Sequence, residues 1–147
     1  DLFFNALEYH ARLIYAADAV VLHPIRPQKW GVSLQQQRKN YYNALLFKKH
    51  PRLYREKFGN HSPLRYYVTL ASLAGAIAGL PLRSPQLAAG SGLVWALLTL
   101  TFAGLRLRGT SHQPAHVVEM LVTSAVIPLL ALYWRVRGNI AFRVWNF

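Results

Sequence analysis

The stretch VVLHPIRPQKW, from Val20 to Trp30, holds residues whose types and spacing could do chemistry. An apolar, β-branched run ends on His23, two prolines then bracket Arg26, and Lys29 follows. A run of β-branched residues before a proline is typical of a short strand that stops there. From these residues alone, we expect His23 to end a strand and Arg26 to face lipid headgroups.

A pair of histidines, His112 and His116, is four residues apart and could share one helix face to hold a metal ion. Pro114 lies between the two, and Glu119 is the only carboxylate nearby, so we favour a loop at headgroup level. Glu119 is a functional candidate because acidic residues near membrane spans are costly. At a helix start, however, a carboxylate also suits the helix dipole. The spacing supports neither a Ser-His-Asp triad nor a Gly-rich phosphate loop.

Charge and apolar content together indicate a membrane protein. The chain has 17 Lys and Arg against 5 Asp and Glu, a net charge of +12, which points to phosphates in nucleic acid or on a membrane. Hydrophobic residues make up 53 % and concentrate in the second half. Because basic residues flank apolar runs, the bilayer and its anionic headgroups are the expected partners, and nucleic acid is not. The absence of cysteine excludes disulfides and thiolate metal sites.

Three apolar runs predict two or three transmembrane helices, over residues 66–82, 84–105 and 117–134; the first two are uncharged, and the third is uncharged from Met120 on. The first two are joined by PLRSPQ, which predicts an antiparallel hairpin. The segment GAIAG, Gly75 to Gly79, has the spacing that lets membrane helices approach closely, although small residues are common in such helices. A soluble helical core is the alternative, but LAAGSGLVWALLTLTFAGL lacks the polar face of a core helix.

Residues 1–31 are expected to form a small α+β unit. LFFNALEYH has helical spacing, whereas RLIYA and AVVLH are β-rich runs on either side of Ala17-Asp18 and predict two small strands. SLQQ fits a capping box, with Ser33 as N-cap and Gln36 reaching back. The helix that it opens is expected to end near Lys49, because His50-Pro51 is a stop signal.

Residues 32–65 predict a basic amphipathic helix in the membrane interface, followed by a linker. An ordinary amphipathic helix packed on a soluble domain is the alternative. The side chains expected at the interface are basic or aromatic. They are Trp30, Arg38, Lys39, Tyr41, Tyr42, Lys48 and Lys49.

Positive charge predicts the topology, because Lys and Arg favour the cytoplasmic side. Ten such residues between Arg26 and Arg65 place residues 1–65 inside, and a hairpin that leaves and returns keeps Arg106 and Arg108 inside as well. A full third span would put three later arginines outside, against the rule. These are Arg135, Arg137 and Arg143. The last segment is therefore re-entrant or interfacial, unless the early charge bias prevails.

A family resemblance covers most of the chain. DLFFNALEYHARLIYAADAVVLHPIRP resembles the end of the catalytic domain in bacterial, membrane-bound family 2 glycosyltransferases, and QQQRKNYYNALLFKKHP is similar to their basic-aromatic helix near the membrane. TSAVIPLLALYWRVRGNIAFRVW resembles their membrane tail. The resemblance implies a mostly α membrane protein. It would comprise a small α+β remnant of a GT-A-type domain, an interface helix, and two or three transmembrane helices in the bacterial inner membrane.

The same resemblance suggests site residues. His23 would lie near a divalent metal, Mg²⁺ or Mn²⁺, in the full-length enzyme, and Arg26 and Lys29 would contact the donor diphosphate. Asp1 matches the acidic residue that follows the family's catalytic dyad, so it is a catalytic candidate by position alone. The donor-binding half is not among these residues. We therefore expect this chain alone to be inactive and to need no cofactor.

Two hypotheses follow. In the first, the chain is the C-terminal part of a glycosyltransferase that moves sugar from a nucleotide donor to a lipid-linked or polysaccharide acceptor. This reading treats the sequence as a fragment, because DLFFNALEYH is typical of the middle of an element. In the second, it is a non-catalytic structural subunit of a larger membrane complex, derived from a truncated glycosyltransferase, with other membrane proteins as partners.

Overall fold

The computed structural model describes residues 2–12, 14–22, 29–58 and 64–144, and the regular structure in these ranges is helical. The elements in chain order are α1 (Leu2–Glu8), α2 (Val32–Gln36), the 3₁₀ helix η1 (Gln37–Tyr42), α3 (Asn43–Lys49), α4 (Pro51–Phe58), α5 (Leu64–Gly79), α6 (Pro85–Leu107) and α7 (Pro114–Phe142). The elements α2, η1 and α3 follow one another without a break. They form one helical segment, residues 32–49, which we call the basic rod.

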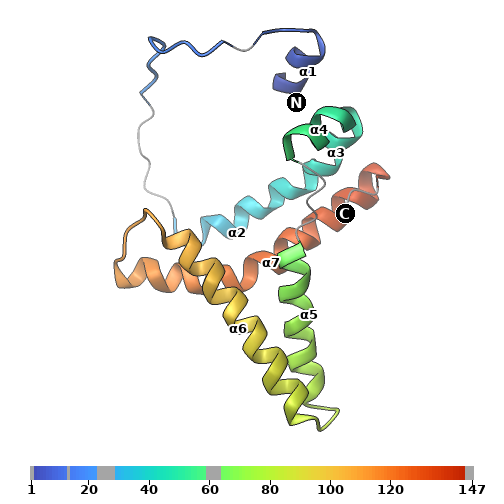
Figure 1. The fold of residues 1–147 in the computed structure, drawn as a ribbon, viewed down its shortest axis with the longest axis vertical. Coiled ribbons are helices and arrows are strands. Elements are labelled where there is room, and N and C mark those ends of the chain that lie inside the picture. Colours follow the sequence, from blue (N-terminus) through green and yellow to red (C-terminus); the bar gives the residue numbers. More distant parts are fainter. Residues whose placement is uncertain (1, 13, 23–28, 59–63, 145–147) are drawn as a thin grey trace.

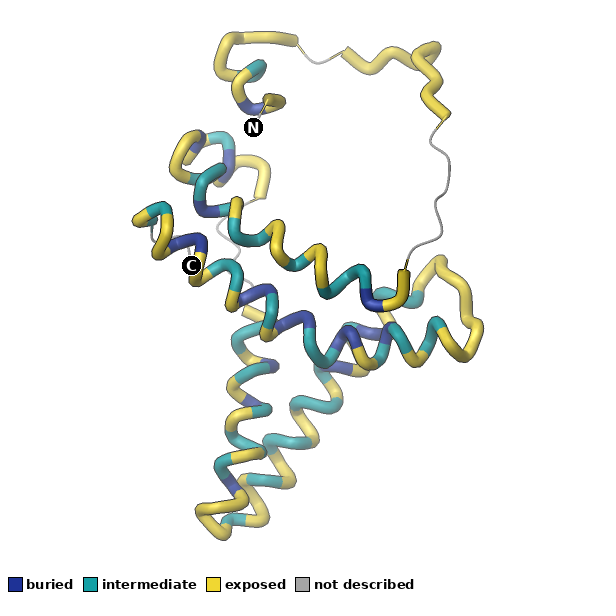
Figure 2. Tube along the Cα trace, turned by 180° about the vertical axis from the view of Figure 1, so that it is seen from behind, coloured by how far each residue is buried: buried dark blue, intermediate teal, exposed yellow. Residues whose placement is uncertain are grey.

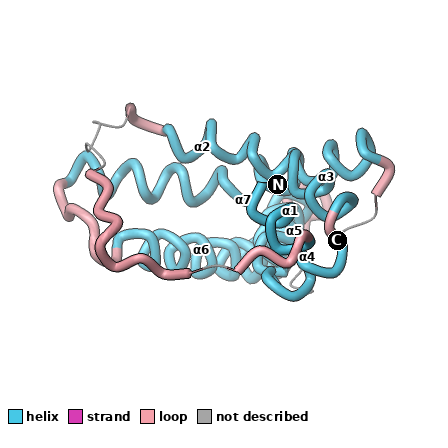
Figure 3. Tube along the Cα trace, turned by 90° about the horizontal axis from the view of Figure 1, so that it is seen from above, coloured by secondary structure: helices cyan, strands magenta, loops and turns pink. Residues whose placement is uncertain are grey.

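α7 lies between the two other parts of the fold. α5 and α6 pair as an antiparallel hairpin, and α7 crosses the open end of that hairpin (Figure 1). The basic rod runs along the other side of α7, so the rod, α7 and α6 appear in that order from above (Figure 3). α7 contacts every element of the hairpin and of the rod. The position of α7 therefore determines how the hairpin and the basic rod are oriented.

The expected hairpin is confirmed, and so is the role of its small residues. A Cβ on Gly79 would collide with the backbone of Ala88, and a Cβ on Gly75 would meet the Ser91 hydroxyl. Both glycines of GAIAG therefore face α6 at the places where the two helices approach most closely. The aromatic rings of Tyr66 and Phe102 meet nearer the open end, with centroids 5.8 Å apart.

The hairpin exposes apolar surface that a soluble core helix would bury (Figure 2). Only 11 % of the apolar stretch of α6 is buried inside the structure, and Leu93, Leu97 and Leu100 are each more than half exposed. At 1.5 Å per residue, α6 is about 34 Å long, and the 16-residue α5 is about 24 Å long. The described residues thus include two helices long and apolar enough to cross a membrane, α6 and α7.

α7 is longer than the predicted third run. The sequence predicts a helix over 117–134, whereas α7 extends from Pro114 to Phe142 and carries two basic residues, Arg135 and Arg137, in its last third. Pro128 lies inside it, where it removes one helical hydrogen bond, and α7 changes direction about halfway along (Figure 1). Its buried side is unusually polar, because Thr123 and Ser124 are both fully buried.

The prediction of an α+β remnant is wrong for the described residues. The described residues of RLIYA and AVVLH form no strand, the chain turns at Ala17-Asp18, and Tyr15 and Leu22 are about nine-tenths exposed. High strand propensity reflects side chains that pack on a sheet, and two isolated short strands are marginal in water. The described part of the chain offers these runs no sheet to join.

The capping box is also wrong. The N-cap of α2 is Gly31, in the left-handed conformation with φ 73°, and no side chain of the rod itself caps the helix. The Ser33 hydroxyl instead accepts a hydrogen bond from Arg106. The predicted end at Lys49 is confirmed, and Pro51 then opens α4 as its first residue.

α1 is helical, as its apolar spacing predicts, and it packs on His50 and on α4. Phe4 is buried against the His50 ring at 5.6 Å and the Phe58 ring at 6.2 Å. A Glu8 carboxylate oxygen lies 2.8 Å from His50 Nδ1. This contact holds residues 2–8 on the side of α7 opposite the hairpin turn (Figure 1).

The close approach of α5 and α6 makes the Gly79→Ala variant a direct test of the hairpin. The added methyl must displace the α6 backbone, so we expect a loss of about 1–3 kcal/mol in the free energy of unfolding. Reversible unfolding in mixed micelles titrated with dodecyl sulfate measures it. Gly90→Ala, where a Cβ meets open space, is the matched control and should be neutral or slightly stabilising. Equal effects of the two variants would contradict this packing.

Candidate membrane-interface site

The surface between α7 and the basic rod is the candidate functional site. The two helices approach most closely at a glycine of α7. A Cβ on Gly138 would overlap the carbonyl of Tyr41, so only glycine lets the two helices meet here. Ala44 on the rod is 1 % exposed, and Asn139 on α7 is 3 % exposed. Lys48 Nζ donates to the Phe142 carbonyl at 3.0 Å, which places a cation at the negative end of α7.

Aromatic rings fill the space beside Gly138. The Tyr41 ring makes edge contacts with Tyr42 at 5.1 Å, Phe142 at 5.2 Å and Trp134 at 6.4 Å. Edge contacts of this kind are favourable beyond the area that they bury. The rod and α7 are therefore held together by a rigid aromatic cluster drawn from both helices.

Two arginines converge on the ring of Trp134. The guanidinium carbon of Arg137 lies 5.4 Å from the ring centroid, and that of Arg38 lies 5.8 Å from it. Both distances are within the range of cation–π attraction. Arg137 Nη1 also donates to the Tyr133 hydroxyl at 3.3 Å. These two arginines, with Tyr41, Tyr42 and Trp134, line a cavity of about 220 Å³, which we call the arginine pocket.

The arginine pocket has no acidic counter-charge among the described residues. Glu8 contacts His50, Glu56 pairs with Arg52, Glu119 lies at the other end of α7, and Asp18 is exposed in the turn at residues 17–18. Two exposed guanidinium groups thus share a small cavity with tyrosine hydroxyls beside them. Arginine presents a planar fork of donors that suits phosphate, so this arrangement can bind a phosphate-sized anion.

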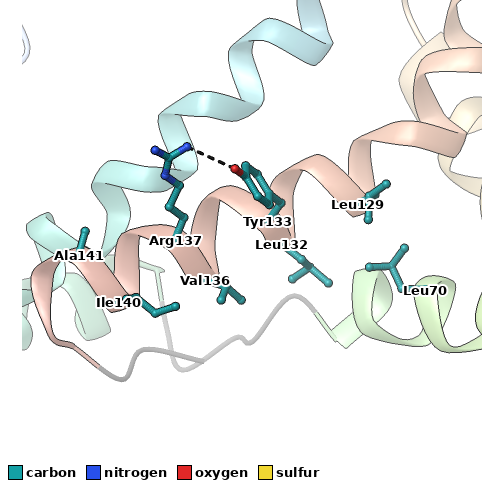
Figure 4. A pocket seen from close by; sticks show the side chains of 8 residues that line it. All are labelled: Leu70, Leu129, Leu132, Tyr133, Val136, Arg137, Ile140 and Ala141. Carbon is teal, nitrogen blue, oxygen red and sulfur yellow. Dashed lines mark hydrogen bonds between the residues drawn. The ribbon is translucent and has the colours of Figure 1, made fainter.

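An apolar groove runs along α7, and Figure 4 shows the residues that line it. It encloses about 690 Å³, and Arg137 lines both cavities. Its other lining residues come from α7, apart from one residue of α5. They are Leu70 of α5 and Leu129, Leu132, Tyr133, Val136, Ile140 and Ala141 of α7. Figure 4 shows Arg137 directed toward the rod, whereas Val136 and Ile140 point to the opposite side.

At the other end of the site, Arg106 ties three helices together. Its Nη1 donates to Thr123 Oγ1 at 2.7 Å and Ser124 Oγ at 2.8 Å on α7, and its Nη2 donates to Ser33 Oγ at 3.1 Å on the rod. The two α7 hydroxyls are 0 % exposed. Hydroxyls buried so deeply need partners, and one guanidinium at the end of α6 supplies them.

Glu119 reinforces the same junction. Its Oε1 accepts a hydrogen bond from the Gly31 backbone N–H at 2.7 Å, just before α2 begins. Its Oε2 lies 3.7 Å from His116 Nδ1, one turn earlier on α7. Glu119 therefore caps the basic rod from another helix. Its expected place at a helix start is wrong, because α7 begins five residues earlier, at Pro114.

The predicted interface residues fall on different faces. Arg38, Tyr41 and Tyr42 meet at the arginine pocket. Lys39 is exposed beside it, Lys48 reaches the end of α7, and Lys49 lines a separate small cavity with Tyr42. Trp30 is 60 % exposed at the start of the rod, next to Lys29. Much of the apolar side of the rod packs on α7.

Three predicted site residues, Asp1, His23 and Arg26, lie outside the described residues. Within the described ranges, no three His, Asp or Glu residues gather closely enough to hold a metal ion. The loop interpretation holds for His112, which precedes α7, but is wrong for His116, which lies in the first turn of that helix.

Sequence reasoning missed Trp134 and Arg137 as parts of a binding surface. In the sequence, Arg137 is noticed only as one of the charges that bear on topology, and Trp134 only as the last residue of an apolar run. Their four-residue spacing from Gly138 and Tyr133 gave a weak signal, because it places aromatic and basic groups on adjoining turns of one helix. The matching residues, Arg38 and Tyr41, lie almost a hundred positions earlier.

No protein-family model, curated protein or solved structure matches this chain.

The Arg106 junction predicts a specific loss in the Arg106→Gln variant. Two buried hydroxyls would lose their charged donor, and we expect a cost of about 1–3 kcal/mol in the free energy of unfolding in mixed micelles. The matched control is Arg108→Gln, two residues later and exposed, which removes the same charge without these contacts. The junction is refuted if the two variants unfold alike.

Proposed function

We propose that this chain is the C-terminal membrane anchor of a glycosyltransferase-like protein. In this proposal the α5–α6 hairpin enters the bilayer, while α7 and the basic rod lie at its cytoplasmic surface. The anchor would hold a catalytic domain at the depth of a lipid-linked or polysaccharide acceptor. The observation that carries the proposal is the contrast between the exposed apolar hairpin and the polar, basic layer across its open end.

The exposed side chains of α6 support insertion. An apolar helix of about 34 Å matches a hydrocarbon core of about 30 Å, and little of its surface is covered inside the chain. α5 is shorter, and Arg83 lies in the turn between the two helices. A long basic side chain can reach the far headgroups from there, and a bilayer thins around a short helix at modest cost.

The crossing of α7 over the hairpin supports an interfacial position for this helix. Once the hairpin stands across the bilayer, a helix that crosses its open end lies along the surface. Arg135, Arg137 and Arg143 then stay on the cytoplasmic side, in agreement with the charge rule. This choice removes the conflict that a full third span creates. The basic rod follows α7, and its cations lie at headgroup depth.

The position of α1 fits the link to a glycosyltransferase. The segment that resembles the end of the catalytic domain begins with α1, which packs on His50 and α4 through Phe4. That contact is on the face away from the hairpin turn (Figure 1). A catalytic domain attached there would sit on the cytoplasmic surface. Sugar transfer would use the donor half of the full-length enzyme, with its divalent metal.

Cysteine labelling tests the topology, because the chain has no native cysteine. Single variants Leu82→Cys, His112→Cys and Arg143→Cys are compared in right-side-out and inverted membrane vesicles with an impermeant maleimide. We expect His112→Cys and Arg143→Cys to react from one side and Leu82→Cys from the other. Reaction of Arg143→Cys on the Leu82 side would instead mean that α7 crosses the bilayer, and uniform sidedness would rule out hairpin insertion.

The intact mass of the native polypeptide separates the enzyme part from a structural subunit. These residues alone have a mass of 16.7 kDa. A much heavier chain that contains them and transfers sugar from a nucleotide donor would support the proposal. A native species of this mass held in a complex would overturn it and favour the non-catalytic membrane subunit.

A further inference from the structure

The arginine pocket and the apolar groove adjoin at Arg137, with the pocket on the side of α7 that faces the rod, and with Val136 and Ile140 of the groove on the opposite side. Arg137 belongs to both, with its guanidinium near Trp134 and its stem beside Tyr133. The polar part comes from the rod and α7, and the apolar part comes from α7 and α5. Volumes of about 220 Å³ and 690 Å³ suit a small polar group and a longer apolar chain.

The positive charge of the arginine pocket favours the binding of an anion. Arg38 and Arg137 converge on one aromatic ring, and no carboxylate of the described residues pairs with either. Tyr42 is 57 % exposed at the same cavity, so its hydroxyl is accessible to a ligand. Bidentate arginine contacts with a phosphate are stronger than contacts between neutral groups.

The apolar groove favours the binding of a hydrocarbon chain that extends away from the anion. Leu129 is 54 % exposed and Ile140 is 69 % exposed, although both are large apolar side chains. Leu70 of α5 lies at the end of the groove near Leu129 and Leu132 in Figure 4. A chain in the groove would thus pass from the rod toward the hairpin.

We infer that this surface binds one anionic glycerophospholipid, with its phosphate between Arg38 and Arg137 and an acyl chain along the α7 groove toward Leu70. The inference rests on the proposed function, because an interfacial α7 sets the arginine pocket at headgroup depth and the groove in the hydrocarbon layer. A soluble phosphate compound would leave the groove empty. A lipid satisfies the charge and the apolar surface together.

Native mass spectrometry of the full chain in detergent tests the site, with phosphatidylglycerol and phosphatidylcholine added separately as probes. We expect wild type to retain one phosphatidylglycerol and little phosphatidylcholine. The Arg38→Gln/Arg137→Gln variant should lose retention by about ten-fold or more, since two charge-assisted contacts disappear. Lys39→Gln/Arg108→Gln removes the same net charge outside the pocket and should retain the lipid.

Two results would overturn the site. One is equal retention of both lipids by wild type, which would mean that the headgroup charge is not recognised. The other is equal loss in both double variants, which would mean that net charge alone holds the lipid. A variant that lost lipid because it unfolded is detected by its circular dichroism and by its elution from a sizing column.

Filling the groove tests the position of the acyl chain. Val136→Trp places an indole in the groove while both arginines remain, and we expect a comparable loss of phosphatidylglycerol. Leu93→Trp, on the exposed side of α6, is the size-matched control and should have no effect. Full retention by Val136→Trp would contradict the chain position.

The failure of this inference can be told apart from the failure of the anchor. The arginine variants should still resist alkaline extraction from membranes, because the hairpin and not the lipid site inserts the chain. If the site fails while wild type stays membrane-integral, the anchor stands. If wild type itself is extracted as a peripheral protein, the anchor and the inference both fall.

Discussion

The mutual orientation of α6, α7 and the basic rod depends on one guanidinium group. Arg106 ends the long apolar helix of the hairpin and donates to hydroxyls on α7 and on the basic rod. A lysine could not contact hydroxyls on two helices in the same way, because its single nitrogen lacks the planar fork. Glu119 adds the second half of the junction by capping the rod at Gly31. The crossing of α7 and the hairpin is therefore set by polar contacts in an otherwise apolar region.

The other end of α7 is held by shape. Gly138 lets the helix touch the Tyr41 carbonyl, and the aromatic cluster then fills the remaining space. Between the polar junction and this contact, the basic rod runs along α7 as a parallel partner. The arrangement produces a surface layer with cations and tyrosines at one level and an apolar hairpin that leaves it. Such a layer can hold an attached domain at a defined distance from lipid headgroups.

Sequence pattern predicts the parts of this fold that depend on local chemistry. The hairpin follows from two uncharged runs and a proline-rich turn, and the end of the rod follows from His50-Pro51. The capping box failed because Arg106, seventy-three residues away, takes the Ser33 hydroxyl. The strands failed because β-branched residues need a sheet to pack on, and the described residues contain none. The seam at Gly138 joins segments distant in sequence, so no local pattern reveals it.

The position of α7 is the central claim, and spin-label accessibility along residues 129–141 tests it most directly. Single cysteine variants carry the label, and collisions with oxygen and with a polar relaxation agent are compared at each position in vesicles. The account predicts an oscillation with the 3.6-residue helical period at constant mean depth, with Val136 and Ile140 on the oxygen-rich side. A steady rise and fall of oxygen exposure along the helix, with no access for the polar agent near its middle, would contradict it.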